Sequence, residues 1–365
     1  MGRMENISEI KDSFELRTDL AVEEKESFPG DGGEVSGVSL KEWIQKKGRI
    51  KLTEVVIMDE KGALAMGKPV GTYLTLEASR LAEKDENYHR EVSEELAKQL
   101  KLLIQEQELK KPKILVVGLG NRLATPDSLG PRVVDNLSMT RHLGKEYGED
   151  FMREKGLLSV SGIVPGVMGQ TGMESAEIVK GVVEETRPDL VIVVDALAAR
   201  SVRRLGTTIQ LTDTGIQPGS GVGNHRNAIT EESVGVPVIA IGVPTVVDAA
   251  TIVNDAMENL MKEMEHSETL KGVGVVLQGY HAAEKYELVR QLISPHLNGM
   301  FVTPKDVDET VKRISFTISE GLNLLFSAKE SNGDSLAKQG EEQDSVKAKG
   351  KETKGQAHNP KKAGI

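Results

Sequence analysis

The stretch ILVVGLGNRLATPDSLGP, residues 114–131, contains the pattern that decides the fold. Its first seven residues form an apolar, β-branched run that ends in glycine, which is typical of a buried parallel strand. Three similar runs follow in the chain: LVIVVDA (190–196), VPVIAIGVP (236–244) and VGVVLQG (273–279). Helical patterns lie between the runs, at 131–143, 174–186 and 249–264. This alternation predicts an α/β fold with an open, mostly parallel sheet flanked by helices.

The segments outside this alternating region differ in character. Residues 1–36 are polar and charged, so we expect a mobile, accessible arm that ends in a glycine-rich connector. Residues 52–77 carry short β-type runs on either side of the turn signal DEKG (59–62), which predicts a β-hairpin or small meander. A helix is expected over 89–109. The tail, 328–365, has almost no large apolar residues and is expected to be disordered.

Composition excludes several classes of function. The net charge of -10 and an aromatic content of 3% argue against direct nucleic acid binding. No run approaches the roughly 20 apolar residues of a membrane span, and no apolar signal core occurs at the N-terminus, so we expect an intracellular protein without membrane contact. The chain has no cysteine, which rules out a thiol nucleophile and a cysteine-type zinc site.

Common cofactor motifs are also missing from the sequence. The segment GLGNRL (118–123) resembles a dinucleotide-binding loop, but Leu123 stands where that loop needs its third glycine. No phosphate-binding GxxxxGK[ST] loop, HExxH zinc motif, calcium loop or GxSxG nucleophile motif occurs. We therefore expect neither a cofactor nor a metal.

Two aspartates follow predicted strands. Asp195 directly follows the apolar residues 190–194, and Asp127 lies in the loop after the run 114–120. Ligands of open parallel sheets gather at the carboxyl ends of the strands, so the two carboxyl groups meet if these strands are neighbours. At about 4 Å and an effective dielectric constant near 20, their repulsion is of order 4 kcal/mol, so the pair would share one proton. Such a pair can activate water and polarise a carbonyl group. Taken singly, each aspartate fits a helix N-cap equally well.

Two glycine-rich loops, 161–171 and 217–227, are candidates for substrate contact, because glycine lets a backbone approach a peptide closely. The candidate residues are Gly166, Gly169, Gly221, Gly223 and His225. The alternative for both loops is a plain connector, and a single loop histidine usually faces water. Thr171 and Glu174 have the spacing of a capping box for the helix that follows.

Five motifs together resemble one family, the germination proteases of spore-forming Bacillus and Clostridium relatives, which degrade small acid-soluble spore proteins. The motifs are RTDLAVE (17–23), GLGNRLATPDSLGP (118–131), GIVPGVMGQTGMES (162–175), VIVVDALAAR (191–200) and TDTGIQPGSGVGNHR (212–226). The resemblance implies a homotetrameric α/β endopeptidase of the forespore and spore core cytoplasm, made as a zymogen that cleaves itself. It implies catalytic roles for Asp127 and Asp195 and a processing site at Asp19–Leu20.

The resemblance divides the chain into a propeptide (1–19), a single α/β peptidase domain (20–327) and the polar tail (328–365), which is not part of the family core. The sheet and the Asp127 loop are also distantly similar to hydrogenase-maturation endopeptidases, whose fold is phosphorylase-like. In those proteins acidic residues at comparable strand ends engage nickel. A metal-linked endopeptidase is therefore one alternative function, and a non-catalytic protein that binds spore proteins is another.

Overall fold

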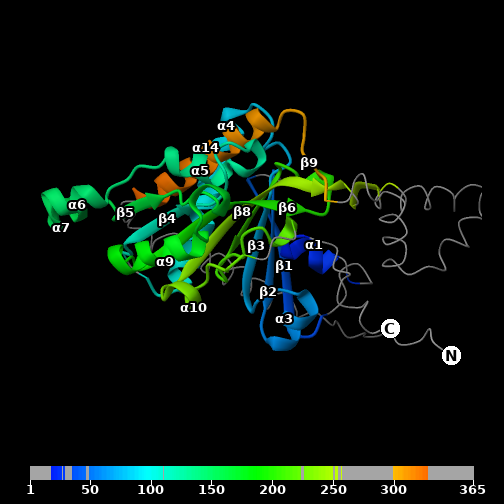
Figure 1. Cartoon of the computed structure of the whole chain (residues 1–365), viewed down its shortest axis with the longest axis horizontal. Coiled ribbons are helices and arrows are strands. Elements are labelled where there is room, and N and C mark those ends of the chain that lie inside the picture. The colour runs from blue at the N-terminus through cyan, green and yellow to red at the C-terminus, as the bar shows by residue number, and fades with distance from the viewer. Residues whose placement is uncertain are drawn as a thin grey trace, which may run out of the picture.

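The computed structural model describes residues 18–26, 28, 35–46, 49–109, 111–222, 226–249, 251–253, 256 and 299–327 (Figure 1). Within these ranges one nine-stranded sheet has the order β1-β2-β3-β7-β8-β6-β4-β5, and β9 pairs with β8. Its strands are β1 (Val38–Gln45), β2 (Ile50–Ile57), β3 (Gly71–Glu77), β4 (Ile114–Gly118), β5 (Val160–Ile163), β6 (Leu190–Ala199), β7 (Thr208–Thr212), β8 (Val238–Asp248) and β9 (Phe301–Val302).

The α-helices of the same ranges vary from a single turn to more than five turns. They are α1 (Ala21–Glu26), α3 (Glu60–Met66), α4 (Glu86–Glu106), α5 (Leu129–Asp135), α6 (Arg141–Tyr147), α7 (Glu149–Lys155), α8 (Met168–Thr171), α9 (Ser175–Thr186), α10 (Glu231–Val234) and α14 (Val307–Phe326). Three short 3-10 helices are η3 (Thr125–Asp127), η4 (Val202–Arg204) and η5 (Ser220–Val222).

The sheet is open and mixed, which confirms the predicted α/β class. Strands β5, β4, β6 and β8 are parallel, and the apolar runs predicted three of them, β4, β6 and β8. The hairpin or meander expected over 52–77 is formed by β2 and β3, whereas no pattern predicted β1, which pairs with β2. These strands continue the same sheet through β7 in antiparallel pairing. From β4 the chain passes to β5 on one side and to β6 on the other, so the crevice for a ligand opens at the carboxyl ends of β4 and β6.

Both faces of the parallel part are covered by helices, which explains why β4 has no polar side chain and why β6 and β8 are mostly apolar. Successive side chains of a strand point to opposite faces. In β4, Ile114 and Val116 pack in the cluster that includes α4 and α14, whereas Leu115 and Val117 pack in the cluster that includes α9. Figure 1 shows α4, α5 and α14 on one side of the sheet and α9 and α10 on the other.

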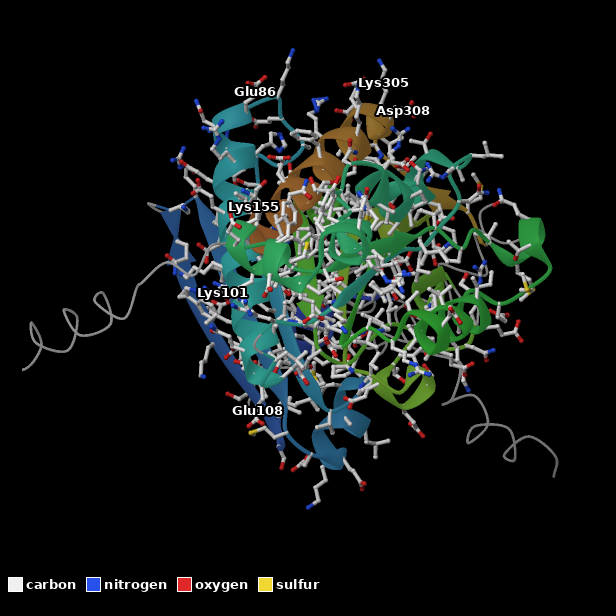
Figure 2. The ribbon with its side chains drawn as sticks, turned by 90° about the vertical axis from the view of Figure 1, so that its left-hand side faces the viewer. Glu86, Lys101, Glu108, Lys155, Lys305 and Asp308 are labelled. Carbon is white, nitrogen blue, oxygen red and sulfur yellow. The ribbon has the colours of Figure 1, made fainter. Side chains whose placement is uncertain are left out.

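Helix α14 packs directly against α4, although no helix was predicted there from sequence. A Cβ on Gly321 would lie 3.0 Å from the backbone oxygen of Ser93, so glycine allows the close approach of the two helices. The Ser93 hydroxyl donates to the backbone oxygen of Thr317 at 2.8 Å. Figure 2 shows Glu86 at the start of α4 and Asp308 in the first turn of α14 at the same end of the molecule.

Four local predictions were wrong, each because a side-chain contact decides the local structure. The single helix predicted over 131–143 is split into α5 and α6, because Thr140 between them bonds to β5 through Val160. The turn signal 59–62 instead begins α3, with Asp59 as its N-cap.

The predicted capping box is displaced by three residues, because Thr171 ends α8 and the side chain of Glu177 accepts from the backbone N–H of Glu174 at 3.0 Å. The predicted mobile arm is packed over residues 18–26, as shown below. The predicted strand 273–279, most of the predicted helix 249–264 and the tail 328–365 lie outside the described residues. None of the described helices is long and apolar enough to span a membrane.

Candidate active site

A cavity of about 480 Å³ opens at the carboxyl ends of β4 and β6. Both aspartates that the sequence singled out line it, one from the loop after β4 and one from β6 itself. The other polar side chains in its wall are those of Asp19, Ser175, Arg226 and Thr245. The topology therefore brings together two carboxyl groups that lie far apart in the sequence.

Asp195 is a buried carboxyl group, 5% exposed, within the continuous strand β6. Its Oδ1 accepts a hydrogen bond from the backbone N–H of Ala196 at 2.9 Å. Burial raises the pKa of Asp195 well above its ordinary value, and the negative charges of Asp127 and then Asp19 raise this pKa further. Because Asp195 lies inside a strand and caps no helix, its N-cap interpretation is wrong.

Asp127 lies at the end of η3 and is partly buried. Its Oδ2 accepts from the backbone N–H of Asn121 at 2.8 Å, so the side chain points back across its own loop. Helix α5 begins after Ser128 and receives no cap from Asp127, which makes the N-cap interpretation wrong here too. Burial raises the pKa of Asp127, while the Asn121 hydrogen bond and the positive charge of Arg226 oppose that rise.

Glycines in the stretch 114–131 allow the Asp127 loop to pack closely against the sheet. Gly120 has φ of +113°, and a Cβ there would lie 2.0 Å from the backbone oxygen of Asp127. A Cβ on Gly130 would lie 2.4 Å from the backbone oxygens of both Leu119 and Val194. Gly120, in the segment that resembles a dinucleotide loop, and Gly130, in α5, thus allow the Asp127 loop and α5 to approach β4 and β6.

Asp19, the residue before the predicted processing site, lies in the wall of the same cavity. The backbone N–H of Asp19 donates to the backbone oxygen of Ala198 at 3.1 Å, and Leu20 is 0% exposed. The backbone oxygen of Asp19 accepts from the side chains of Gln210 at 3.1 Å and Lys68 at 3.3 Å. This part of the arm is therefore a packed element, which corrects the expectation of a mobile segment.

Glu23 anchors the arm next to β6. Its carboxylate accepts from the backbone N–H groups of Arg200 at 2.7 Å and Ser201 at 2.9 Å. It also pairs with Arg204, whose Nε lies 3.4 Å from Glu23 Oε1. Arg204 is 8% exposed and pairs in addition with Glu26 and Glu77. A cation held by three carboxylates, together with two backbone donors, fixes the segment that follows the Asp19–Leu20 peptide.

The predicted glycine-rich loops lie at different distances from this cavity. Gly221 contacts the arm directly, because a Cβ there would lie 2.3 Å from Asp19 Oδ2. The backbone oxygen of Gly166 accepts from the hydroxyl of Ser175, a cavity residue, at 3.2 Å. A Cβ on Gly169 would meet no atom within 4 Å. Gly223 and His225 lie outside the described residues.

Several residues at this site were not predicted from sequence: Arg226, Ser220, Gln210, Glu23 and Arg204. Each of these residues interacts with a residue that is distant in the chain, so no local sequence pattern could predict its place at the site. The one local signal was the spacing of Asp19 and Glu23 around an apolar core in the motif 17–23. Among the residues that the structure describes, no group of three or more His, Asp or Glu side chains is placed to hold a metal ion.

Comparisons with known proteins show which family the chain belongs to. The family model described as germination protease matches residues 15–272. The chain is similar to the germination protease of Caldanaerobacter subterraneus subsp. tengcongensis, with 50% identity over 313 residues that cover 85% of this chain and 94% of that protein. It is also similar to the germination proteases of Clostridium tetani, at 45% identity, covering 85% and 95%, and of Bacillus subtilis, at 40% identity, covering 86% and 94%.

Among solved structures, a nickel–iron hydrogenase maturation protease from Thermococcus kodakarensis matches at 16% identity with a TM-score of 0.27, covering 60% of this chain and 98% of that chain. The match to the family model extends over more than two thirds of this chain, and the relatives match over most of their own length. The chain belongs to the germination protease family, and it is a peptidase of spore germination.

Proposed function

We propose that this peptidase is an atypical aspartic endopeptidase that initiates the degradation of small acid-soluble spore proteins during germination. The observation that carries the proposal is the pair Asp127 and Asp195, two carboxyl groups in one cavity whose pKa values are both raised. Like charges in a poorly solvated site resist ionising together, so the pair holds one proton near neutral pH.

The environment of each carboxyl group suggests its role. Asp195 is the more deeply buried of the two, which favours its protonated form. Asp127 accepts a hydrogen bond from the backbone N–H of Asn121 and experiences the positive charge of Arg226. Both interactions favour its ionised form. In this division Asp127 removes a proton from water and Asp195 donates a hydrogen bond to the carbonyl oxygen of the substrate.

The reaction then follows in two stages. The water oxygen bonds to the carbonyl carbon while its proton passes to Asp127, and the carbonyl oxygen takes the proton of Asp195, which gives a neutral tetrahedral intermediate. The C–N bond breaks as the amine nitrogen takes the proton from Asp127, and one hydroxyl proton of the intermediate returns to Asp195. The products are a carboxylic acid and an amine, and the pair again holds one proton.

We also propose that the chain is a zymogen whose propeptide, residues 1–19, is removed by its own cleavage at Asp19–Leu20. The position of Asp19, the residue before this peptide bond, in the wall of the Asp127–Asp195 cavity supports the proposal. The contacts of Glu23 with Arg200, Ser201 and Arg204 lie after the junction. They would keep the new N-terminal segment in place once residues 1–19 leave.

The remaining parts of the proposal rest on the family resemblance. They are a homotetramer, a location in the cytoplasm of the forespore and spore core, and spore proteins as the substrates. The two alternative functions, a metal-linked endopeptidase and a non-catalytic binding protein, are outcomes that the following experiment distinguishes.

Purified chain incubated with a small acid-soluble spore protein should produce discrete peptides, and its own new N-terminus should be Leu20. N-terminal sequencing and mass spectrometry of both proteins measure these outcomes. Cleavage should persist in excess chelator, and its loss there would favour the metal-linked alternative. Stable binding without fragments would favour the binding protein, and a different new N-terminus would refute the assigned processing site.

A further inference from the structure

The side chain of Asp19 is seated in a small carboxylate receptor beside the Asp127–Asp195 cavity. Asp19 Oδ2 accepts from the backbone N–H of Ala198 at 2.8 Å, and Asp19 Oδ1 accepts from the hydroxyl of Ser220 at 2.7 Å. Each oxygen of this carboxylate thus has its own donor. Hydrogen bonds of this kind are stronger than those between neutral groups.

Gly221 gives this receptor its space. A Cβ at this position would lie 2.3 Å from Asp19 Oδ2, 2.6 Å from Asp19 Cγ and 2.8 Å from the Cβ of Ala198. Any side chain larger than that of glycine would therefore overlap the bound carboxylate. At adjacent positions of η5, Ser220 supplies a hydrogen-bond donor and Gly221 leaves room for the carboxylate.

The receptor lies beside the proposed catalytic pair. Asp19 lines the same cavity as Asp127 and Asp195, and its charge influences Asp195. The backbone of Asp19 is held separately, by Ala198 on one side and by Gln210 and Lys68 on the other. Main chain and side chain are thus bound together, which is the way a protein recognises a residue within an extended peptide.

We infer that Ala198, Ser220 and Gly221 form the pocket that selects an acidic side chain in protein substrates, and that Asp19 occupies this pocket in the unprocessed chain. The inference rests on the proposed peptidase function and adds the residues that determine its specificity. The ligand is the carboxylate of an Asp or Glu that precedes the scissile bond. Loss of residues 1–19 vacates the pocket, while Glu23 keeps the rest of the arm attached.

Two synthetic peptides test the pocket. One has the sequence of residues 13–27, SFELRTDLAVEEKES, and the other, neutral at this position, has alanine in place of its aspartate. The processed parent enzyme should cleave the acidic peptide with the higher kcat/KM. Ser220→Ala should reduce this preference about tenfold, mainly through KM, the usual effect of losing one hydrogen bond to a charged group. Gly221→Ala should abolish the preference.

The neutral peptide and a matched glycine variant separate recognition from folding. Both pocket variants should cleave the alanine peptide at close to the parent rate, because alanine has no side-chain atom beyond Cβ to meet Ser220 or a methyl group at position 221. A loss of folded enzyme would slow this peptide too. Gly181→Ala, in α9 at a glycine with open space around it, should retain the full preference for the acidic peptide. Equal slowing of both peptides by Ser220→Ala and Gly221→Ala would overturn the pocket.

A further variant tests the occupation by Asp19. Full-length Asp19→Ala should cleave the acidic peptide faster, in its first turnovers, than the parent does before it is processed. Equal initial rates would overturn the occupation. A parent enzyme that cleaves acidic and neutral peptides equally would refute the pocket alone, whereas a parent that cleaves neither peptide nor spore protein would refute the proposed function itself.

Discussion

Asp127→Asn and Asp195→Asn should each lower the rate of peptide-bond hydrolysis between about 10²- and 10⁴-fold, because either substitution removes a group that must give or take a proton. An amide has the shape of a carboxyl group, so the hydrogen bonds from Asn121 and Ala196 have acceptors in both variants. The measurements are kcat/KM on the acidic peptide and the rate of self-processing. Asp150→Asn, in exposed α7, is the control and should match the parent. Parent-like turnover by either folded variant, Asp127→Asn or Asp195→Asn, would refute the catalytic roles proposed for these residues.

Asp195→Asn should also leave the protein folded, with a free energy of unfolding that depends on pH in a different way from that of the parent. The pKa of Asp195 is raised in the folded state, so folded protein binds the proton more tightly than unfolded protein does. The stabilisation from this proton is complete below the unfolded pKa of about 3.9 and is lost as pH rises toward the folded pKa. Asparagine titrates nowhere in this range, so the variant should gain stability relative to the parent as pH rises from 4 to 7. Urea unfolding at both pH values measures this difference.

Gly120→Ala should lower activity by about 10²-fold or more, because the new methyl group would displace the Asp127 loop and a shift of about 1 Å can have an effect of that size. The methyl group would lie 2.0 Å from the backbone oxygen of Asp127, a contact that only movement of the backbone can relieve. The positive φ of Gly120 adds a strain of about 1–3 kcal/mol, so the free energy of unfolding should also fall.

Gly172→Ala separates these two effects. Gly172 also has a positive φ, +74°, but a Cβ there would meet no atom within 4 Å. Its replacement should reduce the free energy of unfolding by about 1–2 kcal/mol and leave kcat unchanged. Measurements of kcat and of urea unfolding on both variants check this pair. Equal loss of kcat in both would show that the Gly120 contact does not position Asp127.

Much of the parallel part of the fold follows from the sequence, because buried strands are apolar at every position. The runs that became β4, β6 and β8 are long and continuous, and the positions of Asp127 and Asp195 at strand ends suffice to suggest that they meet. Strands β5 and β7 were not predicted, since VSGI and TIQLT are short and carry polar residues. Their places in the sheet depend on neighbours elsewhere in the chain.

The packing of the arm illustrates a different limit. Local composition suggested a mobile segment, because Glu23 and its neighbours are charged. In the structure Glu23 is buried and finds its partners in Arg200, Ser201 and Arg204, more than 170 residues later in the chain. A buried carboxylate is tolerated only where such donors are present, and sequence pattern alone does not show them. The same holds for Ser220 and Arg226, whose positions beside the aspartates arise from the tertiary fold.

Asp127 and Asp195 should interact strongly enough to hold a single proton between them. The most direct measurement is a carbon-13 NMR titration of the aspartate carboxyl groups, with Asp195 assigned by its absence from the Asp195→Asn spectrum. In the parent, Asp195 should titrate well above 3.8, and in Asp127→Asn its pKa should fall while staying raised by burial. An Asp195 that titrates at its ordinary pKa, or whose pKa is unchanged when Asp127 is neutralised, would contradict the account.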